Sequence, residues 1–408
     1  MGKFLNNLKV LLTAIVLAHA SYSAANTTSD ISDRDLAIII PKDYVHSLPA
    51  FESTNRWGLL PKKAFFDIAN SFIDTAVKTA ITDENSIDEW GIVSARVEPC
   101  APLFPHIRTK STLCWPELRI VLQPILKRKI HAQGSLQEHF ADDRTVHVLY
   151  TVSPYSFLPS EKAAEADRFI STLKAGKPLS DEEFVLFSSL RNEVAKGFLE
   201  ETLQLRSTNT QSSDYAGFDM RPEFYNEFSA SSFVTKFTNF LKRHAFFSRL
   251  HTATAFSLPE GRTPSHTDTW VFKKYTPTKE GGFSEVDITL HHRNGRIMFN
   301  IGKTETASMQ KDDEVFYSDT LTDRQKMMLS HHVVLNRSKD AELLKNIADS
   351  NIFLVEHTSC ASCHKLIDRA PANFHALSYF INEAAPTVSP RVKIDVKHAK
   401  EWILKEIK

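Results

Sequence analysis

Three side chains near the C-terminus have the types and the spacing needed to attach a cofactor covalently. They are Cys360, Cys363 and His364, which form the pattern C-x-x-C-H. Two thiols three positions apart can each add to one vinyl group of a porphyrin, and the next imidazole then lies beneath the iron. This pattern is the attachment signature of c-type haem. It predicts one covalent haem c, held by the two cysteines, with His364 as the proximal iron ligand.

The sixth ligand of the iron decides which function a haem protein has. A protein ligand in that position favours electron transfer, whereas an open position allows small molecules to bind. Small monohaem electron carriers usually have a methionine ligand downstream of the motif, but no methionine follows Met328. Of the downstream histidines, we favour His375 over His398 as the distal ligand because it is closer to the motif. A lone histidine among apolar residues is more often an ordinary core or surface group. We expect an electron carrier rather than an enzyme and predict no catalytic residues, with redox catalysis at the haem as an alternative.

Two other uses of the same dithiol remain open. Cys360 and Cys363 could form a small disulfide in a haem-free secreted binding or structural protein. They could also be the redox dithiol of a periplasmic thiol–disulfide oxidoreductase, because a predicted strand at 351–355 leads directly into them. Only 44 residues follow His364 in the 408-residue chain, which is too few for the remaining strands and cis-proline loop of a thioredoxin-like fold.

The N-terminus predicts export. Residues 1–20 contain a basic start, an apolar run from Val10 to Leu17 and the small-x-small cleavage site Ala18-His19-Ala20, which is the pattern of a signal peptide. A second cleavage site lies near residue 25. The apolar run is too short to span a bilayer of about 30 Å. We therefore expect a periplasmic or secreted protein with no stable membrane anchor after cleavage, and attachment of c-type haem takes place in that compartment.

An exported chain can also form disulfides. Cys100 and Cys114 enclose a ring of fifteen residues that is bounded by prolines. We predict that these two cysteines pair. In the chain-entropy model, a ring of this size stabilises a fold by about 3 kcal/mol.

The overall composition argues against a charged polymer as partner. Lysine and arginine total 49, and aspartate and glutamate also total 49. No basic stripe is present, so we expect no nucleic-acid partner, and the charge balance identifies no redox partner. The hydrophobic content of 42%, with 28 phenylalanines, is ample for a globular core.

The length of the chain favours two lobes, because about 385 mature residues exceed the usual size of a single domain. We predict an N-terminal α+β lobe at 26–206, a linker at 207–222 and a C-terminal α+β lobe at 223–408. The linker is placed where a polar run without apolar periodicity separates two helical stretches.

Hydrophobic periodicity predicts mixed helices and antiparallel strands in both lobes, with the haem-attachment segment near the C-terminus. Asn294-Gly295 separates the last two predicted strands and favours a hairpin turn. Helices are expected at 61–81, 160–173, 180–205, 223–246, 322–335, 339–348 and 395–407. Strands are expected at 92–97, 118–122, 146–152, 270–275, 284–291 and 296–301.

The segment from Cys360 to His364 resembles the attachment motif of cytochromes c, over those five residues and their surroundings. The resemblance implies haem iron, electron transfer and a redox partner. Among proteins with the motif close to the C-terminus, the β-rich cytochromes with a lysine-crosslinked haem are nearer to the hairpins predicted at 270–301 than the helical cytochromes c′ are. The segments 114–124 and 373–375 are also similar to secreted bacterial proteins of uncharacterised function.

Overall fold

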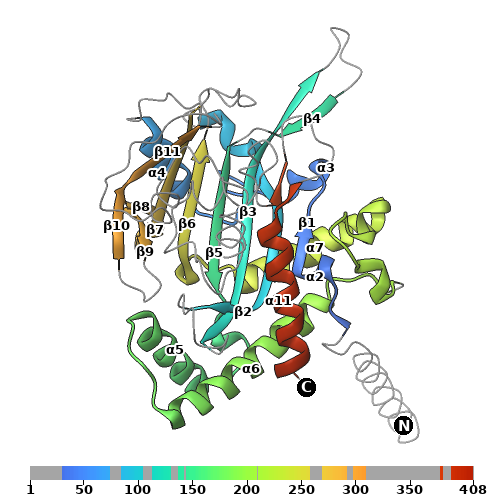
Figure 1. The fold of residues 1–408 in the computed structure, drawn as a ribbon. Coiled ribbons are helices and arrows are strands. Elements are labelled where there is room, and N and C mark those ends of the chain that lie inside the picture. Colours follow the sequence, from blue (N-terminus) through green and yellow to red (C-terminus); the bar gives the residue numbers. More distant parts are fainter. Residues whose placement is uncertain are drawn as a thin grey trace, which may run out of the picture.

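A computed structural model describes the fold over most of the chain. The described residues are 30–73, 84–103, 113–129, 137–141, 144–208, 210–257, 269–291, 297–308, 377–379 and 387–407. Their main element is a twisted antiparallel sheet with helices on both faces (Figure 1). The expectation of a mixed α+β fold is thus confirmed, whereas the predicted elements between 309 and 376 and the signal peptide lie outside the described residues.

The sheet contains nine strands in the described part of the chain. Neighbouring strands follow the order β1-β2-β3-β5-β6-β7-β11, while β4 pairs with β3 and β8 pairs with β7. The bounds are β1 (Ala37–Ile39), β2 (Trp90–Pro102), β3 (Cys114–Lys129), β4 (Gln137–Ala141), β5 (Thr145–Thr151), β6 (Leu250–Ser257), β7 (Thr269–Pro277), β8 (Phe283–Val286) and β11 (Thr304–Ser308).

The residues before and after the predicted linker share one sheet, where two lobes were expected. Strand β5 pairs with β6 across that boundary, and Val148 lies opposite Ala253. One continuous set of buried apolar side chains also includes residues from both sides. The physical reason is that β5 has backbone N–H and C=O groups along the edge not paired with β3, and β6 satisfies them.

The predicted linker at 207–222 is a packed segment in the structure rather than a solvated spacer. It contains the 3-10 helix η5 (Ser212–Tyr215), and both Tyr215 and Arg221 are buried. The polar side chains of this segment therefore form buried hydrogen bonds and ion pairs. Composition alone does not show whether polar side chains are bonded inside the fold or exposed to water.

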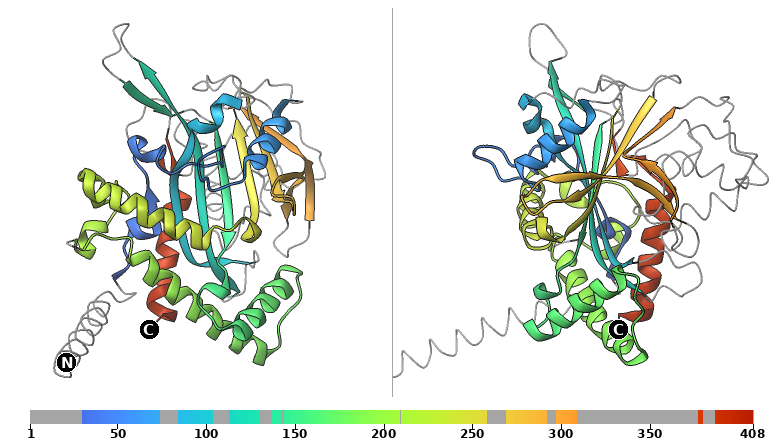
Figure 2. Two further views of the ribbon diagram at one scale, coloured as in Figure 1. Left: turned by 180° about the vertical axis from the view of Figure 1, so that it is seen from behind. Right: turned by 90° about the vertical axis from the view of Figure 1, so that its left-hand side faces the viewer.

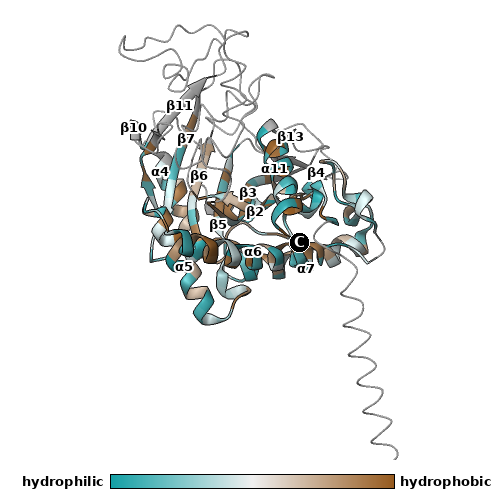
Figure 3. Ribbon diagram, turned by 60° about the horizontal axis from the view of Figure 1, so that its bottom comes forward, coloured by the Kyte–Doolittle hydropathy of each residue, from teal (hydrophilic) through white to brown (hydrophobic). Residues whose placement is uncertain are grey.

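In the part of the chain that the structure describes, five longer helices pack around the sheet. In Figure 1, α11 lies in front of the sheet, α7 lies behind it, and α5 and α6 pass below it, as the views in Figure 2 also show. In Figure 3 these helices alternate between hydrophilic and hydrophobic residues, as expected for helices with one buried side. Their bounds are α4 (Lys62–Ile73), α5 (Ser160–Lys174), α6 (Asp181–Leu203), α7 (Glu227–His244) and α11 (Pro390–Glu406).

Shorter elements complete the described fold. The predicted strand at 284–291 is divided at Asp287, because β8 pairs with β7 while the following strand pairs with β10. The predicted pairing of the last two strands is confirmed, although their turn lies outside the described residues. The remaining bounds are α2 (Asp33–Leu36), α3 (Lys42–Val45), η3 (Glu84–Glu89), η4 (Pro154–Ser156), η6 (Pro222–Tyr225), η7 (Phe247–Arg249), β9 (Ile288–His291), β10 (Ile297–Gly302), β12 (Leu377–Ser378) and β13 (Thr387–Val388).

The two faces of the sheet differ in chemistry, although both contain buried side chains. One face has apolar residues at alternate positions, such as Val97, Leu118 and Val148. The other face has charged and hydroxyl side chains at the positions between them, such as Arg96 and Glu117. Helix α11 covers part of this polar face, and Glu117, Thr151 and Thr252 of the same face line the cleft described below. Within the described ranges, no helix combines the length and apolar character that a membrane crossing requires.

Candidate functional site

The residues predicted to bind haem are not placed by the structure. Cys360, Cys363, His364 and His375 all lie outside the described residues. His398, the other downstream histidine, lies partly exposed on α11. The part of the chain that the structure describes contains no group of three or more histidine, cysteine, aspartate or glutamate side chains that could bind a metal ion.

Tyr379, which lies fifteen residues after His364, is hydrogen-bonded to the sheet and to the chain before α3. The backbone N–H of Tyr379 donates to Gln123 Oε1 at 2.9 Å, and Gln123 Nε2 donates to the Tyr379 carbonyl at 2.6 Å. The Tyr379 hydroxyl donates to the carbonyl of Ile40 at 2.8 Å. Because Tyr379 and Gln123 are buried, these bonds fix the chain beside β3 only fifteen residues after His364.

The predicted disulfide between Cys100 and Cys114 is confirmed. The two Cα atoms are 4.9 Å apart, and the bond joins the end of β2 to the start of β3. Next to it, Ala101 lies opposite Trp115 in the strand register. The disulfide therefore holds the ends of two long strands together at one end of the sheet.

A cleft of about 350 Å³ lies beside this disulfide, on the polar face of the sheet. Its lining combines apolar side chains from the ends of β2 and β3 with hydroxyl and charged side chains from β3, β5, β6 and β7. The described lining residues are Ala101, Pro102, Leu103, Trp115, Pro116, Glu117, Thr151, Lys174, His251, Thr252, Lys274, Thr276 and Val286.

A carboxylate and an imidazole meet in the cleft wall. His251 Nε2 lies 2.9 Å from Glu117 Oε2, and His251 Nδ1 lies 3.1 Å from the Thr252 hydroxyl. The other oxygen of Glu117 accepts a hydrogen bond from Arg119. Burial alone would lower the pKa of Arg119, but the negative charges of Glu117 and of further carboxylates outweigh burial and raise it. Arg119 therefore stays charged and keeps Glu117 paired.

Two lysines bring positive charge to the same cleft. Lys174 is exposed at the C-terminal end of α5, and its Nζ donates to the Thr151 hydroxyl at 3.1 Å. Lys274 is buried on β7, opposite Thr254 of β6. The cleft thus has apolar surface on one side and hydroxyl and ammonium donors on the other.

A charged network connects this wall to α11. Asp395 of α11 is buried, pairs with Arg96 of β2 and accepts a hydrogen bond from Arg391 Nε at 3.0 Å. Glu98 also pairs with Arg96. Burial, together with the nearby charge of Asp395, raises the pKa of Glu98 despite the opposing effect of Arg96. The network neutralises buried charges and fixes α11 on the polar face.

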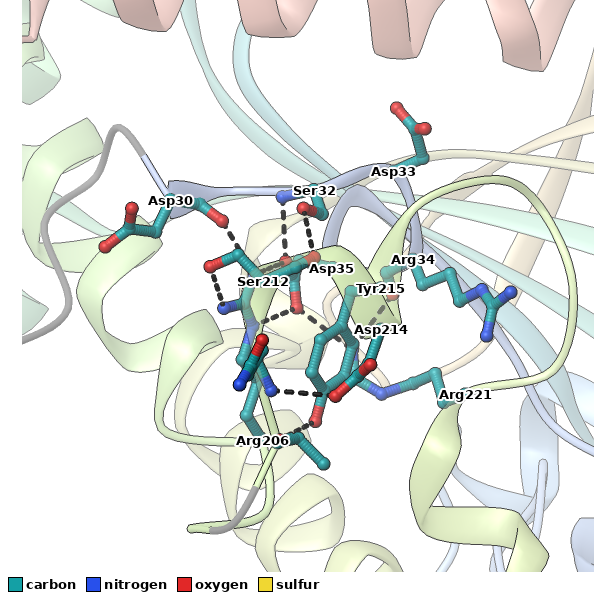
Figure 4. Close-up of polar contacts among 12 residues, drawn as sticks. Asp30, Ser32, Asp33, Arg34, Asp35, Arg206, Ser212, Asp214, Tyr215 and Arg221 are labelled. Atoms are coloured by element: carbon teal, nitrogen blue, oxygen red, sulfur yellow. Dashed lines mark hydrogen bonds and ion pairs between the residues drawn. The ribbon is translucent and has the colours of Figure 1, made fainter.

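A second buried network lies at the start of the described fold (Figure 4). Asp35 of α2 is fully buried and accepts from Arg206 Nε at 3.0 Å, and Arg221 Nη1 lies 3.4 Å from the same oxygen. Arg221 also pairs with Glu223 at 3.2 Å, and the Tyr215 hydroxyl donates to Glu223 at 2.7 Å. Burial, as the largest cause, raises the pKa of Tyr215 to about 12. These groups satisfy one another, so the network holds the 207–222 segment in place.

A buried imidazole also pairs with a carboxylate between α6 and α7. His244 Nε2 lies 2.6 Å from Glu201 Oε2, and the His244 ring stacks on Phe157 with ring centroids 5.4 Å apart. Burial alone would raise the pKa of Glu201, but the hydrogen bond and charge of His244, together with Arg243, outweigh burial and lower it. This pair is therefore expected to contribute to stability only while Glu201 is ionised.

Replacing Glu201 by glutamine is expected to lower the free energy of unfolding by about 1–2 kcal/mol at neutral pH. A carboxyl whose pKa is lower in the folded than in the unfolded state stabilises the fold above its unfolded pKa, and the contribution is lost as the pH falls. The difference between wild type and variant should therefore shrink as the pH falls below 4.5, the usual value. Urea unfolding over this pH range measures it. Glu200→Gln, at the exposed neighbouring position, is the control and should show no such dependence.

Comparison of the chain with protein-family models, with curated proteins and with solved structures gave no match. The cleft was not predicted from the sequence. Glu117, His251 and Lys274 come from three strands, and the strand that carries His251 was not among those predicted. A pattern that could have indicated this face is the recurrence of charged or hydroxyl residues at alternate positions, as at Thr252 and Thr254 in the sequence of β6.

Proposed function

We propose that the protein is an exported c-type cytochrome-like haem protein that transfers electrons through one covalently attached haem. The observation that carries the proposal is the C-x-x-C-H pattern at Cys360, Cys363 and His364. The disulfide supports it, because Cys100 and Cys114 bond to each other. Of the four cysteines in the sequence, the two that remain are therefore those of the motif.

The chemistry of this donor set fits haem c. Cys360 and Cys363 supply one thiol for each vinyl group, and His364 supplies an imidazole nitrogen for the iron. When bound, the haem supplies one-electron redox chemistry. Cys360 and Cys363 would then hold the macrocycle, and His364, with His375 as the proposed second histidine, would supply nitrogen ligands for the iron.

The experiment that tests the proposal is a visible absorption spectrum with a pyridine haemochrome assay. The protein is expressed to the periplasm beside the machinery that attaches c-type haem. We expect one covalent haem per chain in the wild type and none in the Cys360→Ala/Cys363→Ala variant. Cys100→Ala/Cys114→Ala is the matched control, and its folded fraction should retain the covalent haem.

Titration of the reduced protein with carbon monoxide then shows whether the sixth coordination position of the iron is occupied. Little binding is expected if His375 ligates the iron, whereas full binding would show that the position is open. A colourless protein without free thiols would overturn the haem proposal. It would leave a haem-free secreted protein with two disulfides. A colourless protein with a reactive Cys360–Cys363 dithiol would instead favour a thiol–disulfide oxidoreductase.

A further inference from the structure

We propose that the Cys100–Cys114 disulfide is a redox-active bond that exchanges with an external dithiol. Cys100 is the sulfur that is attacked, and Cys114 is the thiolate that leaves. This site is separate from the haem motif and does not depend on haem attachment. Thiol–disulfide exchange requires an attacking thiolate, access to one sulfur and a stabilised leaving thiolate. The dithiol supplies the first of these, and the described residues supply the other two.

The surroundings of Cys114 favour a negative charge on its sulfur. Cys114 is 1% exposed, and Nη1 of Arg191, on α6, lies 3.7 Å from its Sγ. Burial, partly offset by the charge of Glu406, lowers the pKa of Arg191 to about 10, so the guanidinium is still charged at neutral pH. A positive charge beside a cysteine stabilises its thiolate. Cys114 is therefore well placed to be the leaving group.

Two helices hold Arg191 in this position. Its Nε and Nη2 donate to Asn192 Oδ1 at 3.0 and 2.9 Å, and its guanidinium lies over the ring of Trp402, on α11, 5.3 Å from the ring centroid. Nη2 also lies 3.6 Å from the Glu406 carboxylate. The contact with Cys114 is made by the other terminal nitrogen, Nη1. The guanidinium therefore remains beside the sulfur while it is paired with Glu406.

Cys100 differs from Cys114 in exposure and in its backbone setting. It is partly exposed, and it lies where the register of β2 against β3 shifts between Glu98 and Ala101. Irregularities such as β-bulges interrupt the ladder of hydrogen bonds and are over-represented next to active sites. An incoming thiolate therefore reaches the sulfur of Cys100 more easily than the buried sulfur of Cys114.

The two strand ends stay paired on the far side of the disulfide. Ala101 lies opposite Trp115, and the backbone N–H of Leu103 donates to the carbonyl of Leu113 at 3.0 Å. Breaking the S–S bond leaves these backbone contacts in place. We therefore expect the disulfide to be reduced in the folded protein, without prior unfolding.

The exchange proceeds in two steps. One thiolate of the dithiol attacks Cys100 Sγ, the bond between Cys100 and Cys114 breaks, and Cys114 leaves as a thiolate beside Arg191. The second thiolate of the dithiol then attacks the dithiol sulfur of the mixed disulfide and releases Cys100. The dithiol is oxidised to a disulfide, while Cys100 and Cys114 together gain two electrons and, on protonation, two protons.

The first experiment is reduction of the full mature protein by millimolar dithiothreitol at neutral pH, without denaturant. Differential alkylation and peptide mass spectrometry measure each cysteine separately, so Cys360 and Cys363 do not interfere. Arg191→Met should slow reduction of the Cys100–Cys114 bond by about five- to tenfold, because the leaving thiolate loses its countercharge. Arg191→Lys keeps the charge and should stay within about threefold of the wild-type rate. If Arg191 were only structural, its loss would loosen the fold and make reduction faster.

Arg243→Met is the matched control, because Arg243 also pairs with a glutamate, Glu201, at 2.6 Å but is exposed on α7. It should be reduced at the wild-type rate. The proposal is overturned if Arg191→Met is reduced as fast as this control or faster.

A second experiment uses the wild type alone, so it remains decisive if Arg191→Met fails to fold. Brief treatment with glutathione, a monothiol, should leave the mixed disulfide on Cys100, where peptide mass spectrometry locates it. Glutathione on Cys114 would overturn the proposal. The same holds if the Cys100–Cys114 bond is reduced only in denaturant. The haem assay on the same samples tests the other proposal independently.

Discussion

Asp35→Asn should lower the free energy of unfolding by about 3–5 kcal/mol, because it removes the countercharge of two buried guanidinium groups. Asp35 is fully buried between Arg206 and Arg221, and it also accepts a hydrogen bond from the Ser32 backbone N–H at 2.9 Å. Asparagine has nearly the same shape but no charge. The arginines would then remain in a low-dielectric interior with less compensation, while the apolar packing is unchanged. Equilibrium unfolding in urea at neutral pH measures the loss.

Asp219→Asn provides the comparison for this measurement. Asp219 also pairs with an arginine, since Arg34 Nη2 lies 3.2 Å from its carboxylate, but its side chain is 81% exposed. Exposed ion pairs contribute between 0 and about 1 kcal/mol. The two variants therefore separate the effect of burial from the effect of losing an aspartate. Equal unfolding midpoints for Asp35→Asn and Asp219→Asn would contradict the role assigned to the buried network.

Removal of the disulfide should have a comparable effect. The Cys100→Ala/Cys114→Ala variant is expected to lose about 2–5 kcal/mol of stability, because its unfolded chain is no longer restricted by the ring. Cys114 is buried and Arg191 Nη1 lies 3.7 Å from its sulfur, so alanine also removes packed atoms. Thermal unfolding of the variant, beside wild type with and without reductant, measures the loss. Reduced wild type should approach the variant.

An unfolding temperature of this variant equal to that of the oxidised wild type would contradict the stabilising role of Cys100 and Cys114. This result would show that the pairing of β2 with β3 alone fixes the strand ends.

Among the described residues, local patterns predicted the longer helices and many strands well, because their causes are local. Helix α6 begins after Ser180, whose hydroxyl accepts from the Glu183 backbone N–H while the Glu183 side chain bonds back to Ser180. This capping box is visible in the sequence. Helix α7 begins at Glu227 rather than at 223, because Asn226 caps it and the preceding residues form a 3-10 helix.

The arrangement of the strands could not be predicted in the same way. Strand β5 pairs with β6 about a hundred residues later, and no local pattern specifies that partner. The predicted lobes followed from a polar segment whose side chains are in fact bonded inside the fold. The cleft could not be predicted for the same reason, because His251 and Glu117 are 134 residues apart in the sequence and come together only when the sheet forms. The haem motif differs from the cleft in this respect. Its chemistry depends on five consecutive residues, so it can be recognised in the sequence without knowledge of the fold.

The attachment of α11 to the polar face has a consequence for the order in which the chain folds. Arg96 is synthesised 299 residues before Asp395, the carboxylate that pairs with it on this helix. Until Asp395 is available, β2 and β3 place Arg96 and Arg119 on a sheet face that lacks one of its acidic partners. In folding intermediates of the nascent chain, that face of the sheet should therefore remain hydrated. Water is then excluded from it only late in folding, when α11 packs against the sheet.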